Sequence, residues 1–198
     1  MMIYPNFFDS LETITIHDPL AQTLGVGDGI FEYSYLDAVK LAGHSCPTVA
    51  GAWLCVQTAL KKLYDKEIPT RGMIEVAFSN SEDEGVTGVI ASIFTLITGA
   101  SGAGGFKGLQ GNFSRNSKLI FDKEIKSEIK ITRLDSLKSV ELSYDPSSIA
   151  VKPQQQKLMK KLLAKEASKE EIKEFGELWQ ERVKEVLNRG QELITINS

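Results

Sequence analysis

The residues best suited to chemistry are a histidine and a cysteine separated by one residue, His44 and Cys46, in the stretch GHSCP. The chain has only two histidines and two cysteines, so this pair holds half of them. A thiol at a helix N-terminus faces free backbone amides and the positive end of the helix dipole, which favour the thiolate. An imidazole beside it can ligate the same metal ion or transfer a proton.

Three interpretations fit this spacing. The pair is a metal site, or Cys46 is a nucleophile with His44 as its base, or Cys46 caps a helix while His44 is a hydrogen-bonded turn residue. A single His-x-Cys is a weaker metal signal than paired Cys-x-x-Cys clusters. The spacing alone therefore leaves all three interpretations open.

Four more residues are candidate ligands or substrate contacts: His17, Asp37, Glu84 and Lys107. Each has an ordinary alternative role. Glu84 can belong to a solvated, helix-capping face, Asp37 can simply face solvent, and a lone histidine such as His17 is more often structural. Lys107 could meet an anionic substrate group, or simply lie in solvent.

Cys55 is predicted to be inert core, because apolar residues flank it within a helix. Cys46 and Cys55 are nine residues apart, which is roughly 13 Å along a helix at ~1.5 Å per residue. That separation exceeds the ~7 Å Cα limit for a disulfide. The two thiols are therefore predicted neither to bridge nor to share a metal ion.

The elements that position these residues follow from hydrophobic periodicity. Apolar residues from Val49 to Leu63 recur at spacings of three and four and predict a helix that begins at Pro47, with Cys46 as its N-cap. A second, largely apolar helix is predicted over 85–99. Strands are predicted over 11–16, 72–79, 118–122, 127–135 and 139–144, and residues 30–43 read as a strand passing into a helical turn.

The glycine-rich segment 98–112 does not fit a phosphate-binding loop. It matches neither Walker nor dinucleotide-binding spacing, and it follows a helix where such a loop should precede one. We expect its glycines to allow a close backbone approach and the segment to wall a cavity over Cys46, with a plain turn as the alternative.

Composition narrows the class of protein. The chain has 198 residues with 23 basic and 26 acidic side chains, which disfavours nucleic-acid binding. No apolar stretch reaches the ~18 residues of a membrane span, and the N-terminal residues show no basic leader. We therefore expect a cytoplasmic protein with no membrane association.

The stretch GHSCPTVAGAWL, with TGVIASIFTLITGA and GFKG further on, resembles the family of the E-type subunit of formylmethanofuran dehydrogenase over roughly residues 20–140. Gly43, His44, Cys46 and Pro47 match the family motif residue by residue. The resemblance implies a thioredoxin-like α+β core, with a mixed, roughly five-stranded sheet flanked by helices. It also implies that the His–Cys turn is an active site able to hold zinc or another divalent metal such as iron.

Two features depart from that family. Ala100 stands where many relatives have a cysteine, and no cysteine follows Cys55, so the C-terminal zinc finger of many relatives is absent. A Lys- and Glu-rich tail stands in its place and predicts two helices, with Ser168 and Glu171 as a capping box for the second. The apolar stripe predicted for that helix consists of Ile172, Phe175, Leu178 or Trp179, Val183, Val186 and Leu187.

These observations predict a core over 1–150 and a helical extension over 151–198 that packs on the core or on a second subunit. The expected function is that of a divalent-metal-binding protein, either an accessory subunit or a metal-dependent enzyme. The alternatives are a thiol enzyme and a non-catalytic interaction module. Expected partners are a second copy of the chain, as a homodimer, a small anionic ligand and a larger oxidoreductase complex. No site for an organic cofactor is predicted, and whether the protein catalyses a reaction stays open.

Overall fold

A computed structural model describes residues 3–197, and its main sheet has five strands in the order β4-β3-β5-β6-β7. The strands are β3 (Ile74–Phe78), β4 (Leu119–Ile120), β5 (Ile129–Arg133), β6 (Ser139–Tyr144) and β7 (Ile194–Asn197). β3 and β4 are parallel, and the other neighbours are antiparallel. The α+β class and the mixed five-stranded sheet are thus confirmed, while the thioredoxin-like arrangement stays a prediction.

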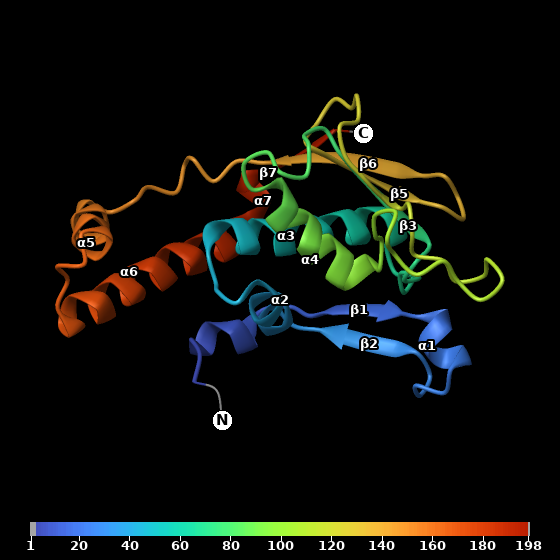
Figure 1. Cartoon of the computed structure of the whole chain (residues 1–198), viewed down its shortest axis with the longest axis horizontal. Helices are drawn as coiled ribbons and strands as arrows, with labels where there is room; N and C mark the ends of the chain where they lie inside the picture. The colour runs from blue at the N-terminus through green and yellow to red at the C-terminus, as the bar shows by residue number, and fades with distance from the viewer. Residues whose placement is uncertain (1–2, 198) are drawn as a thin grey trace.

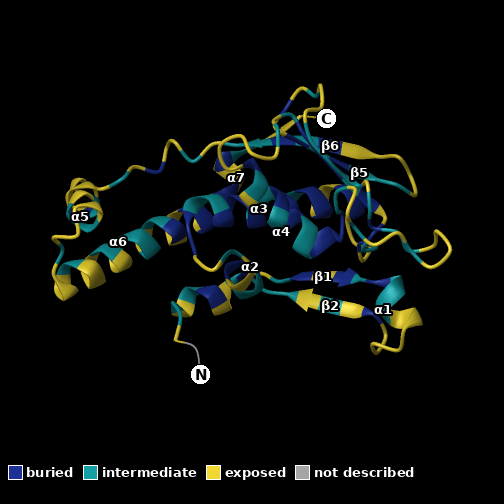
Figure 2. Ribbon diagram, in the orientation of Figure 1, coloured by how far each residue is buried: buried dark blue, intermediate teal, exposed yellow. Residues whose placement is uncertain are grey.

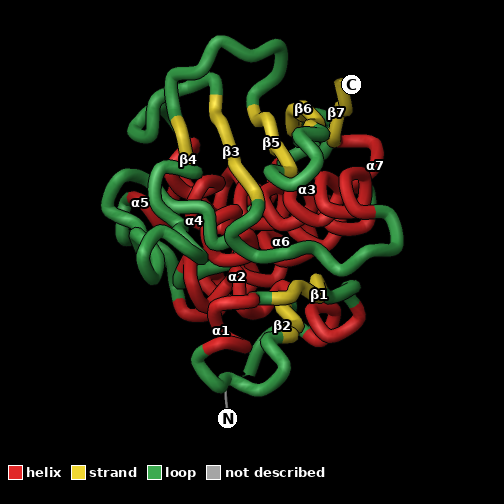
Figure 3. Tube along the Cα trace, turned by 90° about the vertical axis from the view of Figure 1, so that its right-hand side faces the viewer, coloured by secondary structure: helices red, strands yellow, loops and turns green. Residues whose placement is uncertain are grey.

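The alternation of side chains along the strands gives this sheet one apolar and one polar face. Val76, Ile131 and Val140 lie in register across three strands and are buried. The adjacent row contains Lys130 and Glu141, whose charged groups are 3.6 Å apart. Because successive side chains point to opposite faces, helices cover the apolar face (Figure 3).

The covering helices form a layer around α3, which contacts α4, α6 and β6. They are α2 (Tyr35–Ala42), α3 (Pro47–Tyr64), α4 (Thr87–Thr98), α6 (Lys169–Asn188) and α7 (Gly190–Leu193). The predicted helix from Pro47 and the predicted apolar helix are confirmed as α3 and α4. Since α3 has neighbours on several sides, it carries buried residues around most of its circumference.

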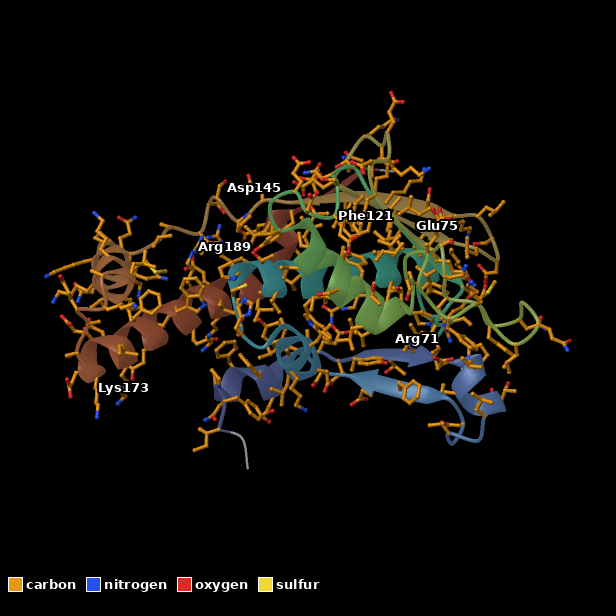
Figure 4. The ribbon with its side chains drawn as sticks, in the orientation of Figure 1. Arg71, Glu75, Phe121, Asp145, Lys173 and Arg189 are labelled. Atoms are coloured by element: carbon orange, nitrogen blue, oxygen red, sulfur yellow. The ribbon has the colours of Figure 1, made fainter. Side chains whose placement is uncertain are left out.

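A two-stranded hairpin lies on the far side of the helices from the main sheet (Figure 1). Its strands are β1 (Ile14–His17) and β2 (Ile30–Tyr33), joined through α1 (Pro19–Thr23) and preceded by a 3-10 helix at Asn6–Ser10. Asp18 ties this layer to the core, because its carboxylate accepts hydrogen bonds from Arg71 at 3.1 Å and from Arg115 at 2.6 Å. Arg71 lies between the hairpin and the helices (Figure 4).

The tail helices leave the core. α5 (Pro153–Leu163) packs against α6, and both extend away from the sheet, with Lys173 at the far end of α6 (Figure 4). The predicted apolar stripe of α6 divides in two. Val183, Val186 and Leu187 are buried against the core, whereas Ile172 is 49% exposed. Figure 2 shows the projecting end of α6 in the colours of exposed and intermediate residues. The predicted capping box of Ser168 and Glu171 is confirmed.

Candidate functional site

The GHSCP stretch forms the turn between α2 and α3. Gly43 ends α2 in the left-handed conformation, with φ of 76°, a region that favours glycine. Cys46 is the N-cap of α3 and Pro47 opens its first turn, as predicted. Proline suits this position because its missing amide would have had no intrahelical partner.

The Cys46 side chain folds back over the first turn of α3. Its Sγ accepts a hydrogen bond from the Val49 amide at 3.5 Å, and the residue is only 8% exposed. The thiol thus satisfies one of the free amides at the helix N-terminus, which is the work of an N-cap side chain. It does so at the positive end of a helix 18 residues long.

His44 is exposed, and its ring orientation is fixed by the end of α2. Its Nδ1 lies 3.0 Å from the Ala42 carbonyl oxygen. Because a carbonyl can only accept, Nδ1 carries the proton and the Nε2 lone pair is left free in the neutral ring. Metal-binding histidines show this same arrangement, in which the second ring nitrogen donates to a backbone carbonyl.

The turn is held from α6 and α2 through Ser45. The Ser45 carbonyl accepts hydrogen bonds from Trp179 Nε1 at 2.8 Å and from Gln180 Nε2 at 3.3 Å. Its hydroxyl is 2.9 Å from the hydroxyl of the buried Tyr35. The residue between the histidine and the cysteine therefore anchors both of them to the core.

Tyr144, at the end of β6, holds the other side of the turn. Its hydroxyl donates to the Pro47 carbonyl at 2.8 Å. Its ring lies against Gly51 so closely that a Cβ there would be 2.2 Å from Cε1. Burial, followed by nearby Cys55, raises the pKa of Tyr144 above its usual value, so the hydroxyl stays a donor.

A cavity of about 310 Å³ adjoins this turn and lies between α3, the loop after β3, and the ends of β5 and β6. Thr48, Cys55 and Tyr144 contribute to its wall, with Glu84 and Glu128. Its volume is in the range of small-molecule sites. Cys55 is 1% exposed, and burial, followed by the charge of Glu128, raises the pKa of its thiol.

Of the other predicted site residues, Asp37 caps α2. Its Oδ2 accepts from the Ser34 amide at 2.9 Å and from the Ser34 hydroxyl at 2.8 Å. Burial by itself raises the pKa of Asp37, but these hydrogen bonds and the charge of Lys40 outweigh it, so the pKa is lowered. The carboxylate is thus occupied by helix capping.

His17 and Lys107 lie in other surroundings. His17 ends β1, where its Nε2 is 2.9 Å from Gln22 Oε1. Lys107 is exposed on the glycine-rich segment, none of whose residues lines the cavity. Neither residue is found in the wall of the cavity, and of the four additional candidates only Glu84 borders it.

Within residues 3–197, no three His, Cys, Asp or Glu side chains come together in a way that could hold a metal ion. His44 and Cys46 are therefore two donors of suitable chemistry without a third protein donor among the described residues. One imidazole and one thiol fit zinc or iron in kind. A four-coordinate ion on this pair would need two further donors from solvent, a ligand or another chain.

Fold and site together define an α+β protein in which a His-x-Cys turn opens a buried central helix beside a ligand-sized cavity. The chain belongs to the FmdE family, described as molybdenum formylmethanofuran dehydrogenase operon, whose model matches residues 41–195. This match extends further into the tail than the resemblance noted from the sequence. No curated protein and no solved structure matches the chain. In the described part of the chain, no helix has both the length and the apolarity to cross a membrane.

Sequence patterns did not identify the groups that hold and border the turn. Trp179 and Tyr144 contact it across 134 and 97 residues of chain. Their signals were indirect: an aromatic residue on a predicted tail helix, and a tyrosine at the end of a strand. Gly51 within the helical pattern was the one local hint that something approaches α3 closely.

Proposed function

We propose that this protein is a metal-binding accessory member of the FmdE family in which His44 and Cys46 hold a divalent ion such as zinc or iron. The observation that carries the proposal is the contact between His44 Nδ1 and the Ala42 carbonyl, which leaves the Nε2 lone pair of an exposed histidine available two residues before the motif cysteine. A bound ion of this kind supplies Lewis-acid chemistry. The chain's own part is to orient the two donors through Ser45 and Pro47.

The open coordination positions are part of this proposal. Two protein donors leave room for solvent, a small molecule or a group from a partner, as open zinc sites require. Glu84, Asp37, His17 and Lys107 lie in separate surroundings, so we do not assign them to the ion. The family description supports an association with the formylmethanofuran dehydrogenase system, and we propose a complex of that enzyme as the partner.

Metal analysis tests the proposal directly. We expect one zinc or iron per chain in the gently purified wild type and loss of that metal in His44→Ala and in Cys46→Ser. Cys55→Ser is the matched control, because it removes the other cysteine. This variant should keep full metal content. A folded wild type that stays metal-free after incubation with zinc and with ferrous iron would refute the proposal.

A thiol enzyme is the second candidate, favoured by the hydrogen bond from the Val49 amide to Cys46 Sγ. In that function Cys46 attacks an electrophile, and the free Nε2 of His44 takes the thiol proton. Alkylation of metal-free protein should then modify Cys46 faster than Cys55, and His44→Ala should slow it. Equal rates with and without His44 would count against this candidate.

We also propose that the extension from residue 151 joins two copies of the chain. Leu163 of α5 is 78% exposed and Ile172 of α6 is 49% exposed, near the projecting ends of both helices. α5 is rich in lysine and the first half of α6 is rich in glutamate. The two helices already attract each other within the chain, through the ion pair of Lys161 and Glu171. A two-fold partner can place the same opposite charges across the interface.

A further inference from the structure

The cavity beside α3 has a chemistry of its own. Its wall includes neither His44 nor Cys46, so it is a place distinct from the two proposed metal donors. Phe78, Ile90 and Ile129 give it apolar surface. An apolar enclosure of this size with a few polar groups is the usual form of a small-molecule site.

The charge of the wall is one-sided. Among the described residues that line the cavity, two are carboxylates, Glu84 and Glu128, and none is lysine, arginine or histidine. The two carboxylates come from different segments, the loop after β3 and the residue preceding β5. Both residues are exposed rather than buried in the apolar interior.

Part of the wall is built rigidly. One oxygen of Glu128, Oε2, accepts a hydrogen bond from the Tyr144 amide at 2.9 Å, which fixes this carboxylate against the sheet. The Tyr144 ring is fixed in turn by Gly51 and by the Pro47 carbonyl. A pre-formed wall loses little conformational entropy when a ligand binds, which favours ligand binding.

We propose that this cavity binds a small molecule with an apolar body and a cationic group, which lies near Glu84 and Glu128. The apolar body replaces water against Phe78, Ile90 and Ile129. An ammonium group gains Coulomb attraction from both carboxylates, whereas a carboxylate ligand of the same shape is repelled. The site therefore selects amines over acids.

Three naphthalene probes of matched shape test the proposal: naphthylmethylamine, naphthylmethanol and naphthoate. We expect calorimetric titration in the presence of a chelator to give the affinity order amine, alcohol, acid. Two solvent-facing ion pairs of up to ~1 kcal/mol each correspond to a preference of up to roughly 30-fold for the amine over the alcohol. Equal binding of the three probes, or no binding of any, overturns the proposal.

Four variants locate the binding. Glu84→Gln with Glu128→Gln should remove the preference for the amine. Glu82→Gln with Asp83→Asn neutralises two carboxylates that are in the loop after β3 but not in the cavity wall, and it should keep the preference. Ile90→Trp fills the cavity from a half-buried position and should weaken all three probes. Unchanged binding in Ile90→Trp overturns the proposal. His44→Ala should leave probe binding intact, which separates this test from that of the metal site.

Discussion

His44 shows how a single contact can decide a side chain's chemistry. Ala42 is the last residue of α2, so its carbonyl has no partner within the helix. The imidazole supplies that partner through Nδ1, and the exposed Nε2 is what remains available. The motif histidine thus combines a structural role with the proposed ligand role, on different nitrogens.

Replacing His44 by alanine should cost little stability. The residue is exposed and makes one side-chain hydrogen bond, so we expect His44→Ala to lower the free energy of unfolding by at most about 1 kcal/mol. Urea unfolding measures this. If the loss is small, the absence of metal in this variant results from the missing ligand. A loss of several kcal/mol would mean instead that the imidazole stabilises the turn.

Gly51 should be intolerant of a side chain. A methyl group there would lie 2.2 Å from Cε1 of Tyr144, which cannot move freely because its hydroxyl is bonded to Pro47. Helix propensity favours alanine by about 1 kcal/mol, but overpacking costs about 1–3 kcal/mol. We expect a net loss for Gly51→Ala in urea unfolding.

Gly176 provides the matched control for Gly51. It is also within a helix, α6, but a Cβ there would meet nothing within 4 Å. Gly176→Ala should therefore stabilise the protein, or at least its tail, by up to about 1 kcal/mol. Equal effects of the two substitutions would show that the Tyr144 ring yields without cost.

The elements themselves were largely predictable, because their signals are local. Alternation identified β3, β5 and β6, the spacing after Pro47 identified α3, and Ser168 with Glu171 identified the start of α6. Four of the described elements were not predicted: the 3-10 helix at Asn6–Ser10, α1, α7 and β7. They have four or five residues each, too few to show a period. β7 exists through its pairing with β6, a contact between segments far apart in the sequence.

Only the part of the candidate site that depends on neighbouring residues could be predicted from the sequence. Cys46 as N-cap and Pro47 at the helix start follow from neighbouring residues. The anchors at Trp179 and Tyr144, and the cavity wall at Glu128, depend on how distant elements pack. The glycine-rich segment was expected to wall a cavity over Cys46, but none of its residues 98–112 is in the wall of the cavity beside α3.

Trp179 connects α6 to the turn, and its contribution can be isolated. Trp179→Phe removes the donor to the Ser45 carbonyl while keeping an aromatic ring, and we expect a loss of about 1 kcal/mol. Gln180 still donates to the same oxygen, so the double variant with Gln180→Ala should lose more than the two single losses combined.

Hydrogen exchange at the Val49 and Ala50 amides provides the local readout for Trp179→Phe. Both amides lie in the first turn of α3, and their exchange should accelerate if α6 holds the turn. Glu177→Gln, on an exposed position of the same helix, is the control and should change nothing. Unaltered exchange in the double variant would show that α6 does not hold the turn.

Asp18 connects the hairpin layer to the core, and its titration makes the stability of the protein depend on pH. Burial by itself raises the pKa of Asp18, but hydrogen bonds from Arg71 and the Ala21 amide and the charge of Arg115 outweigh it, so the pKa is lowered. A carboxyl with a lowered folded pKa stabilises the protein above its unfolded pKa of about 3.9. That contribution is lost as the pH falls through the folded pKa.

Asp18→Asn tests the contribution of the Asp18 ion pairs to stability. Removing one partner of a buried ion pair leaves Arg115, 6% exposed, without its counter-charge, so we expect a loss of about 3–5 kcal/mol near neutral pH. Urea unfolding from about pH 2 to pH 7 should show a shallower acid slope in the variant than in the wild type. Equal slopes of stability against pH in the variant and the wild type would mean that other carboxyl groups cause the acid sensitivity.

The projecting α5 and α6 make the most specific prediction about the whole molecule. An outer surface with Leu163 and Ile172 exposed gains apolar burial if a second copy covers it, at about 25 cal/mol per Å². We expect sedimentation equilibrium to give a mass of two chains of 21.9 kDa each. Ile172→Glu should give one chain, because a charge in an apolar interface is costly without a partner.

Leu24→Glu is the control for this test, since Leu24 is 62% exposed in the loop after α1, far along the chain from the tail. It introduces the same charge at another exposed apolar residue and should leave the mass of the pair unchanged. Metal content should be equal in both variants if His44 and Cys46 bind the ion within one chain. A loss of metal in Ile172→Glu together with the loss of pairing would instead mean that the second copy supplies the missing donors.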